Sequence, residues 1–214
     1  MIWEGYHMRE TSGVLAEHIR KNKVLYLTAF TVFFVGIALG AGTVNTVSDA
    51  AREELNGYFG NFLGSAQAQD IDFIGVLKVC VGTNLKYVLF SLVISLTVFT
   101  LPFHAALLGI KGFSVGFSLG FLIRLYQWKG VLYGLLAAFP SAVVSVPVYA
   151  MIGVMGVNYA CRARKNRDRS TAGEKRMDFL MLVVTLGLLF ALLCVGSLFD
   201  AFLSPVVIKL LFPA

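Results

Sequence analysis

The stretch from Phe179 to Phe199 reads FLMLVVTLGLLFALLCVGSLF and contains no charged residue. A helix that spans the hydrocarbon core of a bilayer needs roughly 20 mainly apolar residues, so this stretch is long enough to cross a membrane. The run from Val24 to Val44 is equally long and equally free of charge. Only 14% of the 214 residues are charged, whereas a soluble domain carries about a quarter. The sequence therefore predicts an all-α polytopic membrane protein.

The number and direction of the spans follow from the distribution of lysine and arginine, which accumulate in cytoplasmic loops. If Gly112 to Tyr126 crosses the bilayer, most basic residues fall on one side, whereas a segment that dips in and returns removes this bias. We therefore predict five spans, a cytoplasmic N-terminus and an extracytoplasmic C-terminus, with a hairpin turning near Gly109 to Gly112. A single integral membrane domain, 1–214, would hold spans at approximately 24–44, 86–108, 112–127, 132–160 and 178–200.

The third predicted span, within the segment KGFSVGFSLGFLIRLYQWKG (111–130), carries a glycine at every fourth position. A phosphate-binding loop would need a preceding strand and a GK[ST] ending, and the segment has neither. Glycines four residues apart lie on one helical face and let a neighbouring backbone approach closely inside lipid. We predict helix packing within one monomer, with a homo-oligomer interface as the alternative. The glycines concerned are Gly36, Gly40, Gly112, Gly116 and Gly120.

Helix-breaking and ionisable residues inside the spans are the next candidates for function. Pro140 and Pro147 lie on nearly the same face of the fourth span, where each frees a backbone carbonyl, and broken spans form substrate sites in transporters. His104 follows Pro102 inside the second span, and an intramembrane ionisable residue is a functional candidate. Every Asp and Glu is expected outside or at the edge of the spans. We therefore predict a neutral His104 bonded to a neighbouring helix, and a permease site near it is the alternative.

Several function classes are not supported by any motif in the chain. Catalysis needs a nucleophile, a base and an orienting group that converge, and no HExxH, GxSxG or paired intramembrane aspartates occur. The three cysteines lack metal-ligand or disulfide spacing. The basic residues flank apolar blocks instead of forming an aromatic-interleaved surface, which argues against nucleic acid. We predict no enzyme activity, no cofactor and no metal.

The largest extracytoplasmic segment follows the first span and contains SDAAREELNGYFGNFLGSA (48–66). Ser48 can cap a helix, and the acidic residues after it suit a helix N-terminus. The apolar residues then recur at helical spacing, which predicts an amphipathic helix. It would either rest on the bilayer or bundle mouth, or dock a partner. The candidate docking residues are Leu55, Tyr58, Phe59 and Phe62.

Several short motifs resemble the stage II sporulation protein M family. They are VGIALGAGTVNTV (35–47), TNLKYVLF (83–90), TLPF (100–103) and LLGIKGFSVGFSLGFL (107–122), and the similarity runs from the first span to the end of the fourth. Members often carry a polar amide after the first proline of the fourth span, where this chain has Ser141 and Ala142. The positions matched include Asn84, Lys86, Pro102, Lys111, Trp128, Pro140 and Pro147.

The resemblance implies a five-span membrane protein of endospore-forming bacteria without a catalytic centre. It also implies a scaffold that recruits the peptidoglycan-degrading stage II sporulation proteins P and D at the septal membrane during engulfment. We therefore expect a multi-pass protein of the bacterial cell membrane, located at the sporulation septum or the engulfing mother-cell membrane. The competing class is a small-molecule or ion transporter, or a permease-like subunit, that uses His104 and the kinked fourth span.

Overall fold

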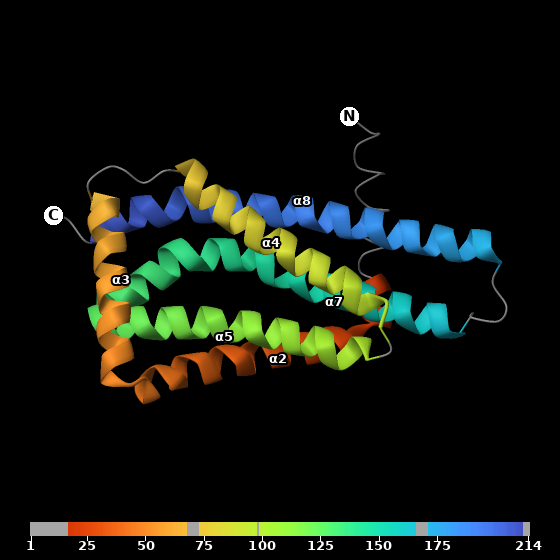
Figure 1. Cartoon of the computed structure of the whole chain (residues 1–214), viewed down its shortest axis with the longest axis horizontal. Coiled ribbons are helices and arrows are strands. Elements are labelled where there is room, and N and C mark those ends of the chain that lie inside the picture. Colours follow the sequence, from red (N-terminus) through yellow and green to blue (C-terminus); the bar gives the residue numbers. More distant parts are fainter. Residues whose placement is uncertain (1–16, 68–72, 98, 166–170, 212–214) are drawn as a thin grey trace.

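The computed structural model describes residues 17–67, 73–97, 99–165 and 171–211, and these residues contain helices and no strand (Figure 1). Five helical segments are long and apolar enough to cross a membrane, which confirms the predicted all-α membrane fold. The orientation of the termini stays a prediction. The elements are α2 (Lys23–Thr43), a 3₁₀ turn (Val44–Thr46), α3 (Asp49–Gln67), α4 (Phe73–Ser95), α5 (Thr100–Tyr126), α6 (Trp128–Tyr133), a π-helical turn (Gly134–Ala138), α7 (Phe139–Lys165) and α8 (Ala172–Leu211).

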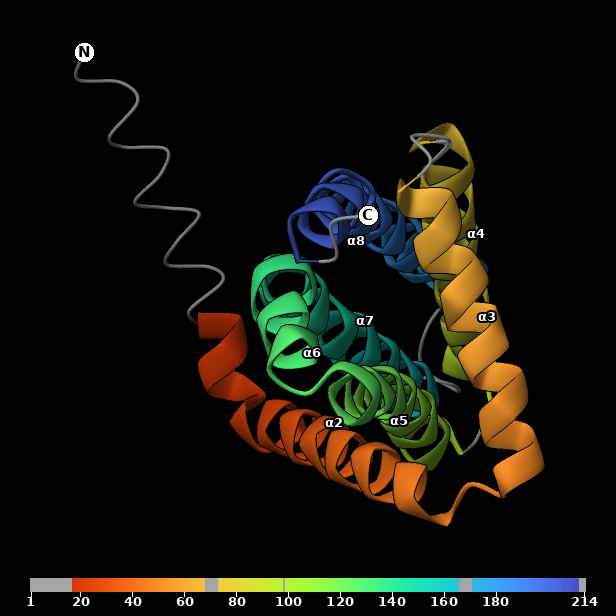
Figure 2. The ribbon, with the colours of Figure 1, turned by 90° about the vertical axis from the view of Figure 1, so that its left-hand side faces the viewer.

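The long helices run roughly along one axis, and α3 crosses one end of the bundle nearly perpendicular to them (Figure 1). Seen from that end, α2 lies beside α5, α7 lies near the centre, and α8 and α4 form the other side (Figure 2). The closest helix pair is α2 with α5, followed by α7 with α8 and α4 with α8. The main core is made of buried apolar and aromatic side chains from all five spans, including Phe33, Tyr87, Leu108, Ile152 and Leu193.

The boundaries of the second and third spans differ from those expected. The predicted turn near Gly109 to Gly112 is wrong, because α5 runs through these residues without interruption. The chain turns instead between Ser95 and Thr100, where the Thr100 hydroxyl donates to the Thr97 and Ile94 carbonyls at 2.7 and 3.2 Å. A proline is tolerated in the first turn of a helix, so Pro102 can follow directly. The second span is therefore Phe73–Ser95 and not 86–108.

The fourth and fifth spans are longer than predicted. The fourth spanning segment runs from Trp128 to Lys165 and contains the π-helical turn just before Pro140. Proline has no N–H for the helical ladder, and both prolines and π-bulges are places where helices kink. The fifth continues past 200 to Leu211, with Pro205 inside it. Residues 201–211, which lie beyond the predicted end of the fifth span at 200, are thus part of α8.

Candidate functional site

The five predicted packing glycines all lie in the contact between α2 and α5. A Cβ added to Gly112 or Gly116 would overlap a backbone carbonyl of α2, that of Phe33 or Ile37. One added to Gly36 or Gly40 would overlap a carbonyl of α5. At Gly120 the fit is looser, since the nearest atom, the Cα of Ala41, is 3.0 Å away. The two helices therefore touch backbone to backbone within one chain.

The predicted outer helix is α3, which begins after Ser48 and packs against α8. Its first turn is held by the Ala51 N–H, which donates to the Ser48 hydroxyl at 3.4 Å, and by an Arg52–Asp49 ion pair at 3.3 Å. Of the four candidate docking residues, Leu55 is half-buried and Tyr58 is 78% exposed. The side chains of Phe59 and Phe62 lie outside the described part of the structure.

His104 is buried against α4 and has a partner for each ring nitrogen. Its Nδ1 lies 2.9 Å from the Thr100 carbonyl, which can only accept, so Nδ1 carries the proton and donates. The Ser91 hydroxyl, 2.8 Å from Nε2, then donates to that nitrogen in the neutral ring. The histidine lies against Gly156 of α7, where a Cβ would stand 2.8 Å from Nε2. His104 thus fills a tight three-helix contact.

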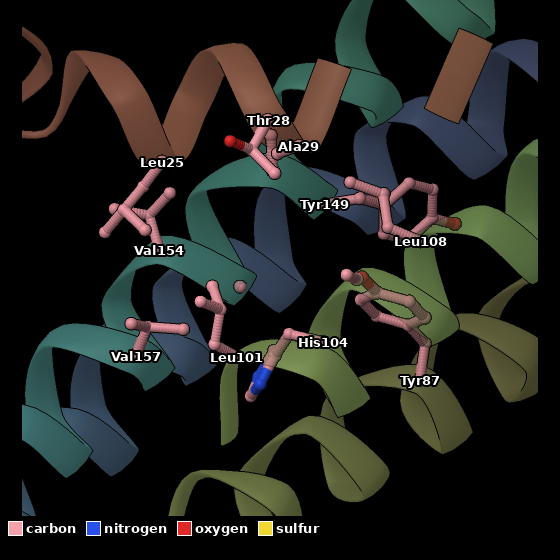
Figure 3. A pocket seen from close by; sticks show the side chains of 13 residues that line it. Leu25, Thr28, Ala29, Tyr87, Leu101, His104, Leu108, Tyr149, Val154 and Val157 are labelled. Atoms are coloured by element: carbon pink, nitrogen blue, oxygen red, sulfur yellow. The ribbon is translucent and has the colours of Figure 1, made fainter. Parts of the chain in front are cut away.

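The Ser91–His104 pair has the hydrogen bond of a nucleophile and its base, a geometry that the sequence motifs did not indicate. Ser91 has no exposed surface, however, and does not line the cavity beside His104. That cavity offers only about 30 Å³ to the centres of water-sized molecules and is lined mainly by aliphatic side chains (Figure 3). A substrate carbonyl has no route to the hydroxyl, so we interpret the pair as a structural contact.

A polar network in the core joins α4, α7 and α8 around Asn84. The Tyr149 hydroxyl donates to the Asn84 side-chain oxygen, and the Asn84 amide donates to the Ser197 hydroxyl at 2.8 Å. Ser197 in turn donates to the Leu193 carbonyl at 3.1 Å. Hydrogen bonds between side chains of different helices stabilise membrane bundles, so this matched family position has a clear structural role.

Lys111, expected in a cytoplasmic loop, lies inside α5. Its ammonium is 5.1 Å from the centre of the Tyr149 ring and 5.9 Å from that of Tyr87, within the range of cation–π attraction. The expectation that no carboxylate occurs inside a span is wrong for Asp200, because α8 continues for eleven residues beyond it to Leu211. Lys111 and Asp200 line one cavity, together with Asn84 and Ser141.

The other matched family positions are peripheral to this cavity. Lys86 is exposed on α4, and Trp128 is 80% exposed at the start of α6. Pro102 lies in the first turn of α5, and Pro147 lies inside α7 and is exposed. Among the described residues, no group of His, Cys, Asp and Glu has the arrangement of a metal site. The chemistry that the structure brings together is therefore charge and hydrogen bonding around Lys111 and Asp200.

The comparisons with known proteins agree with the arrangement of spans. A family model described as stage II sporulation protein M matches residues 29–205, from α2 into the last part of α8. No curated protein and no solved structure matches the chain. The match covers well over half of the chain and includes at least part of each of the five spans, and the chain therefore belongs to the stage II sporulation protein M family.

Proposed function

We propose that this sporulation-related membrane protein is a non-catalytic scaffold that localises peptidoglycan-degrading enzymes during engulfment. The family resemblance implies this role and names the stage II sporulation proteins P and D as partners. The structural observation that supports it most is α3, a helix that crosses one end of the bundle and presents an exposed Tyr58. Exposed aromatic side chains are typical anchors of protein interfaces.

The proposed mechanism is localisation at the sporulation septum. An enzyme that is tethered to one membrane acts on the adjacent wall at a raised effective concentration, without any new catalytic contact. The five spans supply the anchor, and α3 supplies a helix that crosses one end of the bundle. The buried, fully bonded Ser91–His104 pair is consistent with a protein that takes no part in the chemistry itself.

The test is a crosslinked pull-down of the tagged protein from membranes of its sporulating host. We expect proteins P and D to co-purify with the wild type and to be lost when Tyr58, Phe59 and Phe62 are replaced by alanine. The control is Asn56→Ala, because Asn56 is an exposed polar residue of the same helix. Retained binding by the triple variant, in a folded and inserted protein, would exclude α3 as the docking surface. Absence of both enzymes from the wild-type sample would refute the scaffold role.

The permease alternative places a substrate near His104, and the structure does not favour that position. Both ring nitrogens are bonded, and the adjoining cavity is small and mainly aliphatic. The alternative predicts loss of flux on His104→Ala. We expect that variant to lose stability and to show no specific defect in transport.

A further inference from the structure

The largest of the described cavities lies among α4, α5, α7 and α8. It offers about 280 Å³ to the centres of water-sized molecules, whereas one water needs only about 10–15 Å³ by that measure. Its polar lining comes from four different helices: Thr83 and Asn84, Lys111, Ser141 and Ser145, and Asp200. A cavity of this size and polarity is not required to pack a bundle, because the α2–α5 contact shows that this chain can pack its helices without a gap.

The two charged residues face this cavity, Lys111 far from the start of α5 and Asp200 far from the end of α8. Lys111 lies eleven residues from the start of α5, and Asp200 lies eleven residues from the end of α8. At 1.5 Å per residue, each is about 16 Å from a helix end, and the two ends are at opposite faces of the bundle (Figure 1). A hydrocarbon core about 30 Å thick that is bounded by these two helix ends would place both charges near its centre. Charges at this depth are costly and mark functional sites.

The charges are not paired with each other. Among the described residues, neither side chain forms an ion pair within 4.0 Å. The Lys111 ammonium instead faces the rings of Tyr87 and Tyr149, and the Asp200 carboxylate lies beside the Ser141 hydroxyl. A half-buried lysine and a half-buried aspartate, which could relieve each other's desolvation as an ion pair, thus line the same cavity without forming one.

Hydrogen bonds that involve neither Lys111 nor Asp200 fix the walls of this cavity. Asn84 is fully engaged by Tyr149 and Ser197, which ties α4 to α7 and α8. The Thr83 hydroxyl donates to the Val79 carbonyl at 2.8 Å and keeps an acceptor lone pair. The walls of the cavity are therefore preorganised, and Lys111, Asp200 and the Thr83 hydroxyl can interact with a bound ligand.

We propose that this cavity binds a small zwitterion, a molecule that carries a primary ammonium within a few bonds of a carboxylate or phosphate. The anionic group would face Lys111, and the ammonium would face Asp200 and the Ser141 hydroxyl. An anion alone would leave the aspartate unpaired, a cation alone would leave the lysine unpaired, and a neutral molecule would compensate neither. Only a ligand with both charges removes both desolvation penalties. The site does not depend on the scaffold role.

Two sources offer this chemistry, a free amino acid and a phospholipid headgroup of the phosphoethanolamine type. The first test uses the purified full-length wild-type protein and measures the thermal unfolding midpoint against the concentration of alanine, propionate and ethylamine. These molecules have nearly the same size, but the last two each lack one charge. A second arm records, by native mass spectrometry, retention of phosphatidylethanolamine against phosphatidylglycerol.

Saturable binding of alanine, about 30-fold or more tighter than that of either single-charge analogue, would support a free zwitterion. Selective retention of phosphatidylethanolamine with no effect of alanine would support the lipid source. Equal stabilisation by alanine and one analogue, or no selective binding in either arm, would overturn the proposal. Both arms use the wild-type protein, so a loss of binding cannot be caused by a variant that fails to fold.

Variants then locate the site. Lys111→Met and Asp200→Asn should each weaken selective binding by about 30-fold or more. The controls Lys86→Met and Asp178→Asn remove a charge of the same sign from the same kind of helix outside this cavity, and they should bind like the wild type. Unchanged binding by both cavity variants would show that the ligand sits elsewhere and would overturn the assignment.

Discussion

The bundle holds its helices together in two different ways on its two sides. Between α2 and α5, glycines bring the backbones into contact and leave no room for side chains. Among α4, α7 and α8, the contact is made by Asn84, Tyr149 and Ser197, and a polar cavity lies next to it. Apolar burial does not drive helices together within lipid, so close packing and hydrogen bonds must do so. The first arrangement is dry, because the backbones themselves are in contact, and the second leaves space for a ligand.

The largest effect should come from a side chain placed in the dry contact. In Gly116→Val, the new Cβ overlaps the Ile37 carbonyl and its Cα, so the two backbones must separate. We expect a loss of about 3 kcal/mol or more, since overpacking a tight core costs about 1–3 kcal/mol even without a backbone clash. The measurement is the thermal unfolding midpoint in detergent, together with the level of protein in the membrane.

The matched control for this variant is Gly187→Val. Gly187 also lies inside a span, but no atom is within 4 Å of the position of its Cβ. This control should be close to the wild type. If both valine variants were equally destabilised, helix propensity and not the α2–α5 contact would explain the glycines, and the contrast between the two sides would fail.

A smaller loss is expected on the polar side. Asn84→Leu leaves the buried Tyr149 hydroxyl without its acceptor, at a cost of about 1–3 kcal/mol. Tyr149→Phe removes the orphaned group, so the double variant should lose less stability than the sum of the two single variants. Chemical unfolding in mixed micelles measures this coupling. Strict additivity would mean that the hydrogen bond contributes nothing to the folded state.

Thr185→Val serves as the control for the comparison of Asn84→Leu, Tyr149→Phe and their double variant. The Thr185 hydroxyl donates only to the Met181 carbonyl of its own helix, at 2.7 Å, so its loss should cost less than about 0.5 kcal/mol. A cost as large as that of Asn84→Leu would show that any lost hydroxyl or amide destabilises the bundle equally. The network among α4, α7 and α8 would then have no special role.

These two sides also differ in how far the sequence predicts them. The glycines recur at helical spacing within one segment, so their shared face can be recognised from the local pattern. Asn84, Tyr149 and Ser197 come from three helices and form no pattern along the chain. Lys111 was expected in a turn, because a lysine next to glycines is also typical of a loop, whereas it lies inside α5. Asp200 was expected at the edge of a span because it directly follows the uncharged run that ends at Phe199, whereas α8 continues beyond it to Leu211.

A third effect, smaller again, concerns His104 on the polar side. Ser91→Ala removes the donor to Nε2 and leaves that nitrogen buried without a partner, at a cost of about 1 kcal/mol. The control is Ser118→Ala, because Ser118 is exposed on α5. This control should be as stable as the wild type. A fluorophosphonate probe, which labels reactive serines, should label neither the wild type nor the two variants. Labelling of the wild type at Ser91 would show that the hydroxyl is reachable and would contradict a purely structural pair.

The smallest effect is expected at the end of the bundle where α2 begins, outside the spanning segments. There the Asn158 amide of α7 donates to the Asn22 side-chain oxygen at 3.0 Å, and the ring of His18 packs edge-on against Tyr26 at 6.1 Å. Burial lowers the pKa of His18, and the nearby Arg162 lowers it further. The folded state therefore favours the neutral ring, and the stability it contributes is present above pH 6.5 and is lost as the pH falls.

We expect the thermal unfolding midpoint of the wild type to fall slightly between pH 8 and pH 5, because His18 becomes protonated more readily in the unfolded state. His18→Gln, which cannot titrate, should reduce that fall, and Arg162→Gln should do so by a smaller amount because burial is the larger cause of the shift. An identical pH dependence in wild type and His18→Gln would show that this contact titrates without affecting the bundle. The contact between the start of α2 and α7 would then depend on the Asn22–Asn158 hydrogen bond and not on the charge of His18. The position of α2 would be determined mainly by its contact with α5.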